Sequence, residues 1–207
     1  MVNWLNTLVG ETQAKLLGLL RRSQHTIAEL SENLGLTDNA VRTHVASLGR
    51  DGLVKSVGTR RIAVGKPAQI YALSAEGEEL FPKAYAQVLG GLLEEIARSE
   101  GPQRAVELLR AVGRSVATQT KVPADPAARV NAAAVALRSL GGDVDVERTS
   151  SGWRLQGFGC PLSAVTTQRA DACELARALI EEITGQQVTE CCERSPRPRC
   201  AFLVDAA

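Results

Sequence analysis

Apolar and polar positions near the N-terminus follow helical spacing in two adjoining segments separated by a short break. Thr26 and Glu29 have the Thr-x-x-Glu spacing of a capping box, which predicts a first helix directly after Thr26. Gly35 is typical of the left-handed residue that ends a helix. Thr37 can then cap a second helix over Asp38–Arg50. The pattern predicts a helix-turn-helix.

The second predicted helix has one apolar face and one polar face. Val41, Val45 and Leu48 recur at helical spacing, and we expect them to face a core. The opposite face carries side chains that can bond base edges or phosphates. Together with the capping threonine, the candidate DNA-contacting residues here are Thr37, Asn39, Arg42, Thr43, His44 and Ser47.

A basic hairpin is predicted directly after this helix. Residues 53–57 and 69–73 have the pattern of two strands joined by a long tip. A positively charged hairpin beside a recognition helix suits phosphate contact or insertion into the minor groove. The candidate DNA contacts in the hairpin are Arg60, Arg61 and Lys66.

These features agree on a winged helix-turn-helix domain over residues 1–77 that binds double-stranded DNA, with residues 11–22 forming a preceding helix. The alternative is a small helical domain with a solvated basic loop. That alternative explains the loop charge but not the agreement of caps, turn and helix faces. Because the net charge of the chain is only +1, DNA affinity must come from this local patch.

A helical region over residues 78–117 is expected to connect the domains and to hold two copies of the chain together. Residues 74–99 predict one long helix or a broken pair, and residues 102–116 predict another helix. We favour a homodimer, since dimers bind two half-sites of DNA, over packing of the first helix on its own domain. The continuous apolar stripe of that helix comprises Tyr85, Val88, Leu89, Leu92, Leu93 and Ile96.

The last part of the chain, residues 127–207, predicts a small α+β domain beyond a linker at 118–126. The expected elements are helices at 127–140 and 172–184, strands at 144–148 and 153–158, and a hairpin of 187–193 with 200–204. The fold class expected for the whole chain is therefore α+β, with the winged helix-turn-helix domain first.

Several function classes are not expected. The chain has no apolar run long enough to span a membrane and no secretion signal, so we expect a cytoplasmic protein without a membrane partner. It has no Ser/His/Asp triad, no phosphate-binding glycine loop and no paired carboxylates in a plausible pocket. We therefore do not expect an enzyme.

All five cysteines of the chain lie in the C-terminal domain: Cys160, Cys173, Cys191, Cys192 and Cys200. Without a secretion signal, such a group favours metal or redox chemistry over structural disulfides. Cys191 and Cys192 are adjacent on a predicted strand, so their side chains point to opposite faces and only one can join a given site. A site closed by Cys160, Cys173, one of the pair and Cys200 offers four thiolates, which suit an iron–sulfur cluster or Zn²⁺. The alternative is that they are buried small apolar residues.

The chain resembles SufR-type regulators, the iron–sulfur-sensing repressors of cluster-assembly operons within the winged-helix superfamily. The resemblance extends from about residue 11 to the C-terminus, and its segments are LTDNAVRTHVASLGRDGLV, GKPAQIYALSAEGEELFPKAY, GFGCPL, CELARALIEEITGQQV and CERSPRPRCAF. It implies a homodimer whose C-terminal cysteines hold a [4Fe–4S] cluster.

The resemblance also implies a set of ligands. Cys160, Cys173 and Cys200 match the spacing of the family ligands. Some members have a further cysteine four residues before the first ligand, where this chain has Gln156. The predicted metal ligands are Cys160, Cys173, Cys192 and Cys200, with Cys191 the reserve for Cys192. A cluster on three cysteines with another ligand, and a divergent site that holds zinc or nothing, remain open.

The function expected from the sequence is that of a sequence-specific transcription regulator, most simply a repressor, whose DNA affinity is controlled by an iron–sulfur cluster. Two alternatives stay open. In one, the C-terminal domain binds a small hydrophobic effector, and zinc has only a structural role in that domain. In the other, Cys191 or Cys192 pairs with Cys200 as a thiol–disulfide switch.

Overall fold

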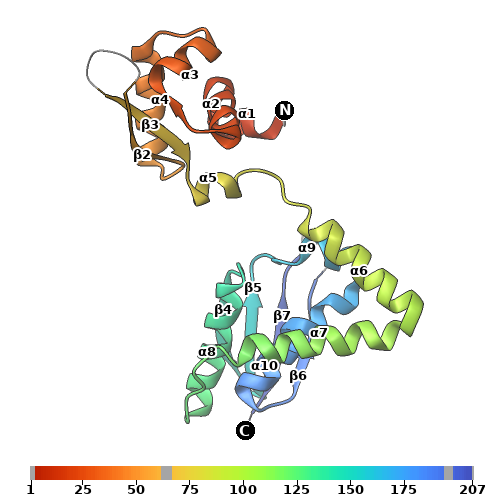
Figure 1. Cartoon of the computed structure of the whole chain (residues 1–207). Coiled ribbons are helices and arrows are strands. Elements are labelled where there is room, and N and C mark those ends of the chain that lie inside the picture. The colour runs from red at the N-terminus through yellow and green to blue at the C-terminus, as the bar shows by residue number, and fades with distance from the viewer. Residues whose placement is uncertain (1–2, 62–66, 194–197, 207) are drawn as a thin grey trace. The chain divides into compact units, whose positions relative to one another are not determined.

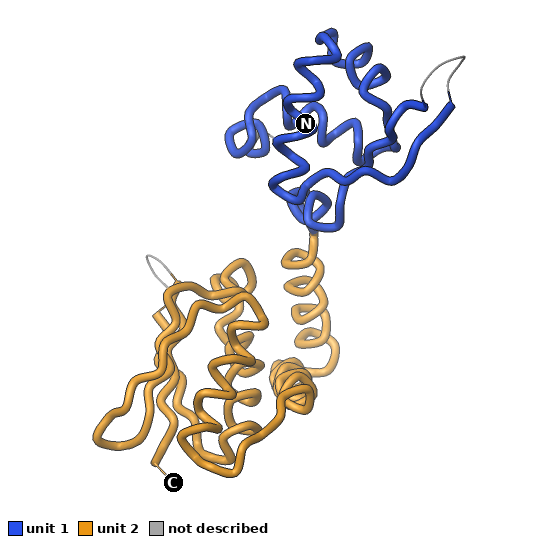
Figure 2. The backbone as a smooth tube through the Cα atoms, turned by 90° about the vertical axis from the view of Figure 1, so that its left-hand side faces the viewer, with its two compact units in different colours: residues 1–83 blue, residues 84–207 orange. Residues whose placement is uncertain are grey.

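A computed structural model describes residues 3–61, 67–193 and 198–206 of the chain. The chain forms two compact units, Met1–Lys83 and Ala84–Ala207, shown in two colours in Figure 2. The fold is α+β, with an N-terminal helix-turn-helix unit and a cysteine-containing C-terminal unit, as predicted. The helices α6 and α7, which the sequence analysis placed in a connecting region, belong to the second unit.

The first unit is a winged helix-turn-helix (Figure 1). Its elements are α1 (Asn3–Val9), α2 (Glu11–Arg22), β1 (His25–Thr26), α3 (Ile27–Leu34), α4 (Asp38–Arg50), β2 (Val54–Arg60), β3 (Ala68–Leu73) and α5 (Ala75–Glu79). The three strands form an antiparallel sheet in the order β1-β3-β2. Helix α1 and the short strand β1 are additions to the predicted elements.

Local capping residues set the helix boundaries of this unit, as predicted. The Thr26 hydroxyl accepts a hydrogen bond from the backbone N–H of Glu29, and the Glu29 carboxylate accepts one from the backbone N–H of Thr26. Gly35 ends α3 in the left-handed conformation, with φ 66°. The Thr37 hydroxyl accepts from the backbone N–H of Ala40 and begins α4. The turn between the two helices is therefore fixed at both ends.

The core of the first unit is built from the apolar faces that the periodicity predicts. Val41, Val45 and Leu48 of α4 are buried against the apolar side of α2 and α3. Phe81, which follows α5, joins the same cluster. Burial of this face leaves the polar face of α4 toward solvent.

The second unit is a four-stranded antiparallel sheet with helices packed on it. Its helices are α6 (Tyr85–Glu100), α7 (Pro102–Ala117), α8 (Pro126–Ser139), α9 (Ser163–Thr166), the 3₁₀ helix η1 (Ala170–Cys173) and α10 (Glu174–Thr184). Its strands are β4 (Val144–Thr149), β5 (Gly152–Gly157), β6 (Val188–Glu190) and β7 (Ala201–Asp205), in the order β4-β5-β7-β6.

The main core of this unit lies between the sheet and two helices. Apolar residues of α8 and α10, among them Leu137 and Ile180, pack against Leu155 and Phe202 of the central strands. Helix α7 lies against α10 at close range. A Cβ atom placed on Gly113 of α7 would come 2.2 Å from the backbone oxygen of Leu175. The absence of a side chain at Gly113 therefore lets the two backbones approach.

An ion-pair network also joins α7 to α10. The Arg110 guanidinium donates to Glu174 at 2.6 Å and to Glu181 at 2.5 Å, and Arg177 bridges the same two carboxylates. These hydrogen bonds raise the pKa of Arg110, with the bond to Glu174 the largest cause. The network is partly buried, so it fixes the orientation of α10 more firmly than a surface pair would.

The apolar stripe predicted on the helix at 85–96 divides into two parts. Leu93 is buried, and Leu89 and Ile96 pack in the same cluster with Ala105 and Leu109 of α7. The other three residues of the stripe stay in solvent, with exposed fractions of 73% for Tyr85, 66% for Val88 and 55% for Leu92. Half of the stripe therefore packs within its own unit.

Two predicted elements in the C-terminal region differ from the structure. The helix predicted at 172–184 starts as the 3₁₀ helix η1, and its α-helical part begins only at Glu174. The strand predicted at 187–193 ends at Glu190, and an isolated bridge then pairs Glu193 with Arg199. Both changes fall beside cysteines. Among the helices of the described residues, none is both long and apolar enough to cross a membrane.

A candidate thiol metal centre and a candidate DNA interface

The polar face of α4 is the first candidate site. Asn39, Arg42 and Thr43 are exposed, and His44 and Ser47 are half-buried. The Arg42 guanidinium lies 3.9 Å from the Asp38 carboxylate one turn earlier, with both side chains well exposed. Such an exposed pair is weak, so Arg42 is free to exchange it for a base or phosphate. The Thr43 hydroxyl donates to the backbone oxygen of Asn39 at 3.0 Å.

The three basic residues predicted to act in the wing have different surroundings. Arg60 donates to the Glu29 carboxylate at 2.9 Å, which ties the hairpin to the start of α3. The pKa of Glu29 is lowered, first by the hydrogen bond from the Thr26 backbone and also by Arg60. Arg61 is exposed. Lys66 lies outside the described residues. Arg60 therefore has a structural partner, whereas the described surroundings of Arg61 leave its charge toward solvent.

Four cysteines from separate segments meet in the second unit. Cys160 follows β5 in a turn, and Cys173 is the last residue of η1 and the N-cap of α10. Cys192 follows β6, and Cys200 directly precedes β7. Cys173 is buried and the other three are half-buried. Cys173 lies at the N-terminus of α10.

The fifth cysteine lies apart from the other four. Cys191 is exposed, and its Sγ donates toward the backbone oxygen of Thr189 at 3.9 Å. The Cys192 Sγ accepts a hydrogen bond from the backbone N–H of Ala201 at 3.3 Å. The two adjacent side chains therefore have different environments, although both lie beyond the end of β6.

Interactions between the thiols connect all four grouped cysteines. The pKa of Cys160 is lowered to about 6, chiefly because it accepts a hydrogen bond from Cys200. The pKa of Cys200 is raised to about 12, chiefly by the same bond, which its proton makes. Contact with Cys173 lowers the pKa of Cys192, but the bond with Cys200 and burial outweigh it and raise that pKa to about 12. These interactions link Cys160 with Cys200, Cys200 with Cys192, and Cys192 with Cys173.

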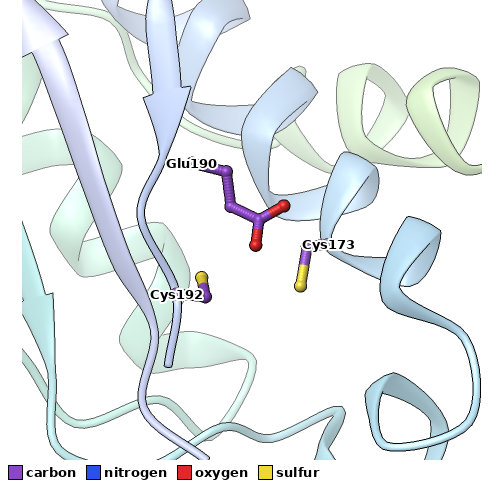
Figure 3. A group of neighbouring side chains, drawn as sticks. All are labelled: Cys173, Glu190 and Cys192. Atoms are coloured by element: carbon purple, nitrogen blue, oxygen red, sulfur yellow. The ribbon is translucent and has the colours of Figure 1, made fainter. Parts of the chain in front are cut away.

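A carboxylate that the sequence analysis did not assign to the site joins this group. Ligand atoms of Cys173, Glu190 and Cys192 all lie within 4.8 Å of one another (Figure 3). Glu190 is the last residue of β6 and is half-buried. The signal in the sequence was the alternation that puts Val188, Glu190 and Cys192 on one face of a strand. The charge of Glu190 on a face that otherwise points inward could have indicated a polar site.

An apolar cavity of about 220 Å³ adjoins three of the thiols. Its wall includes Cys160, Cys173 and Cys200 together with Thr166. The rest of the wall is almost entirely apolar and includes Val112, Val116, Leu137, Leu162, Leu175 and Phe202. An apolar surround of this kind limits the access of water to a thiol-bound metal group.

The residues present fit a metal group that takes four thiolates. A [4Fe–4S] cluster and tetrahedral Zn²⁺ are both held by four cysteines. Among the described residues, Cys160, Cys173 and Cys200 line one cavity, and the Cys192 sulfur lies within 4.8 Å of the Cys173 sulfur, whereas Cys191 is exposed. Gln156, at the position where some of the resembling regulators have a cysteine, instead donates its amide N–H toward the backbone oxygen of Cys200 at 3.4 Å.

Comparisons with known proteins bear on the first unit. Residues 10–56 match the family described as bacterial regulatory protein, arsR family. A solved structure of a Lactococcus lactis ZitR mutant, C30AH42A in apo form, is 19% identical, with 46% of this chain and 86% of that chain covered. The TM-score of this match is 0.29. No curated protein matches the chain. Residues 10–56 of the first unit are therefore similar to the helix-turn-helix region of this family of regulatory proteins.

Proposed function

We propose that this chain is a homodimeric transcription regulator whose affinity for its operator is set by a [4Fe–4S] cluster in the second unit. The observation that carries the proposal is the meeting of Cys160, Cys173, Cys192 and Cys200 beside an apolar cavity in a chain with an ArsR-type DNA-binding unit. The cluster would join separate segments of the chain. The stability of this link would depend on oxidants and on iron supply.

The four proposed ligands have distinct mechanical roles. Cys160 belongs to the turn after β5, Cys173 to the start of α10, and Cys192 with Cys200 to the two ends of the last hairpin. A common anchor ties these elements together, and its loss leaves them joined only by their packing. The segment around Cys173 is the most sensitive part, because α10 contacts α7 through Gly113 and through Arg110.

The proposed DNA contacts follow from the exposure of α4 and the wing. Arg42 is the proposed base contact, and Asn39, Thr43, His44 and Ser47 flank it on the same face. Thr37 sits at the N-terminus of the helix, where backbone N–H groups can meet a phosphate. Arg60, Arg61 and Lys66 are the proposed wing contacts.

The proposed dimer uses the exposed half of the α6 stripe. Tyr85, Val88 and Leu92 recur at i, i+3 and i+7 and stand in solvent although all three are apolar or aromatic. A second copy would remove this surface from water. Because α6 is the first element of the second unit, a dimer through this helix would influence how two DNA-binding units are spaced.

A test of the cluster is purification of the full chain without oxygen. We expect brown protein with broad visible absorption, and we expect Cys160→Ser and Cys173→Ser each to bleach it. Cys191→Ser is the matched control and should keep the colour, because Cys191 lies outside the group. Colourless wild-type protein with bound zinc would contradict the cluster and favour a zinc site.

A second candidate function is the binding of a small apolar effector. The specific observation is the cavity of about 220 Å³, whose lining is almost entirely apolar. The same purified protein separates the two candidates. An effector site predicts colourless protein whose DNA affinity depends on an extracted apolar compound, whereas the cluster predicts colour that follows the cysteines.

A further inference from the structure

We propose that Cys173, Glu190 and Cys192 form a mononuclear site for a thiophilic divalent cation such as Zn²⁺, which is occupied when the cluster is absent. The inference rests on the proposed function in one respect: it shares Cys173 and Cys192 with the cluster. The independent observation behind it is a distance. The sulfurs of Cys173 and Cys192 and a carboxylate oxygen of Glu190 all lie within 4.8 Å of one another (Figure 3).

The distances suit a single metal ion. Zn–S bonds of about 2.3 Å and Zn–O bonds of about 2.1 Å place tetrahedral ligand atoms about 3.6–3.8 Å apart. The three atoms need to move together by only about 1 Å to meet that geometry, which side-chain torsions can supply. Three ligands from the chain leave a fourth position for a solvent molecule, as in zinc sites that are not fully closed.

Together, the two thiols and the carboxylate favour binding of a cation more strongly than any one of these groups does alone. A carboxylate and two thiols that approach one another repel when ionised, and a divalent cation removes that repulsion. Each thiol would give its proton to the buffer on binding.

Glu190 distinguishes this site from the four-thiol site. Cys160 and Cys200 lie outside the group of three, and Glu190 is the member that is not a proposed cluster ligand. Loss of the carboxylate should therefore weaken binding of a single ion without removing any cluster ligand. Loss of Cys160 should do the reverse. The two variants separate the two sites.

The second unit would then have two states with different metals. With the cluster, all four cysteines are joined. With a single ion, η1 and the segment after β6 stay joined, while the turn that carries Cys160 is released. The cluster and the single ion both need Cys173 and Cys192, so binding of one excludes the other. The sensor would therefore respond to the balance of zinc and iron.

The experiment is an anaerobic titration of the cluster-free full chain with Co²⁺, followed by displacement with Zn²⁺. We expect one Co²⁺ per chain with the charge-transfer absorption of two thiolates. Glu190→Gln should weaken binding more than about tenfold, because even loss of a group that only orients a ligand costs about 10–100-fold. Glu193→Gln, which removes an exposed carboxylate on the same segment, should bind as the wild type does.

Cys160→Ser is the variant that makes the outcomes distinct. It should keep Co²⁺ binding while it loses the visible absorption of the cluster. If Glu190→Gln binds Co²⁺ as tightly as the wild type, the inference is overturned. If Cys160→Ser loses Co²⁺ as completely as Cys173→Ser does, the ion sits among the four thiols and the inference is also overturned. Failure of the wild type to bind a cluster would overturn the proposed function alone.

Discussion

At the residue scale, Arg42 is the residue proposed to contact a DNA base. It is exposed in the middle of α4, where it makes a weak ion pair with Asp38. We expect Arg42→Ala to cost about 1–3 kcal/mol of operator binding and to relax sequence preference at one position. Competition binding with substituted operators measures this. Equal losses on all sequences would instead mean that Arg42 contacts only phosphate.

Arg61 provides the comparison for Arg42. It is an exposed wing residue, whereas Arg60 is held by Glu29. We expect Arg61→Ala to weaken binding to all sequences and to lower the slope of log K against log salt by about one. Affinity measured over a series of salt concentrations tests the change. An unchanged slope would place Arg61 away from the phosphates.

Glu29 links the wing to helix capping, and its contribution depends on pH. Its pKa lies below the ordinary value of 4.5, first because the Thr26 backbone donates to it. The stability that it contributes is therefore present above its ordinary pKa and is lost as pH falls through the lowered value. We expect Glu29→Gln to lower the free energy of unfolding at pH 7 and to lose this effect in acid. Glu32→Gln, on the exposed side of α3, is the control in the same denaturant series.

At the element scale, predictions that rest on local signals agree with the structure. The boundaries of α3 and α4 follow from Thr26, Gly35 and Thr37, because capping involves only neighbouring residues. Helix α1 was missed because its first turn has no acidic residue and its last turn no basic one. The strand predicted at 187–193 ends at Glu190, because pairing with β7 ends there and periodicity alone does not mark that end.

Burial partners and site members depend on contacts between distant segments, so periodicity alone could not assign them. The stripe of α6 correctly predicts an apolar face, but Leu93 packs on α7 while Leu92 stays in solvent. The cysteines were grouped by composition and face; the structure places Cys192 beside Cys173, and Cys160, Cys173 and Cys200 on one cavity wall. Glu190 was left out because a charged side chain at a strand end is usually solvated.

Gly113 gives a prediction that belongs to helix packing. A methyl group there would meet the Leu175 backbone oxygen at 2.2 Å, so α7 and α10 would have to separate. We expect Gly113→Ala to destabilise the second unit by about 1–3 kcal/mol, as overpacking does. Gly90→Ala is the matched control, because Gly90 is also helical and has open space around its Cβ position. Denaturant unfolding followed in the second unit should show loss for the first variant only.

At the scale of the whole molecule, the exposed residues of α6 predict the oligomeric state. Val88→Asp with Leu92→Asp would place two charges in the proposed apolar interface, where they would lack partners. We expect the double variant to run as a monomer by light scattering and to lose tight binding to a palindromic site. Val135→Asp, at an exposed apolar residue of α8, should stay dimeric. A dimeric double variant would move the interface away from α6.

The regulatory link itself is tested by comparing cluster-loaded and cluster-free protein on one operator. Without their common anchor, the turn at Cys160, the start of α10 and the last hairpin loosen, and α7 loses a fixed support. Each DNA-binding unit must reach its half-site about one helical turn from the other, so a looser dimer binds more weakly. We expect a loss of about 5–150-fold, the usual range for coupling between two sites, at one fixed salt concentration. The thermal unfolding of the first unit should stay unchanged, because its core uses none of the cysteines. Equal affinities of the two forms would show that a cluster, even when bound, does not control the DNA.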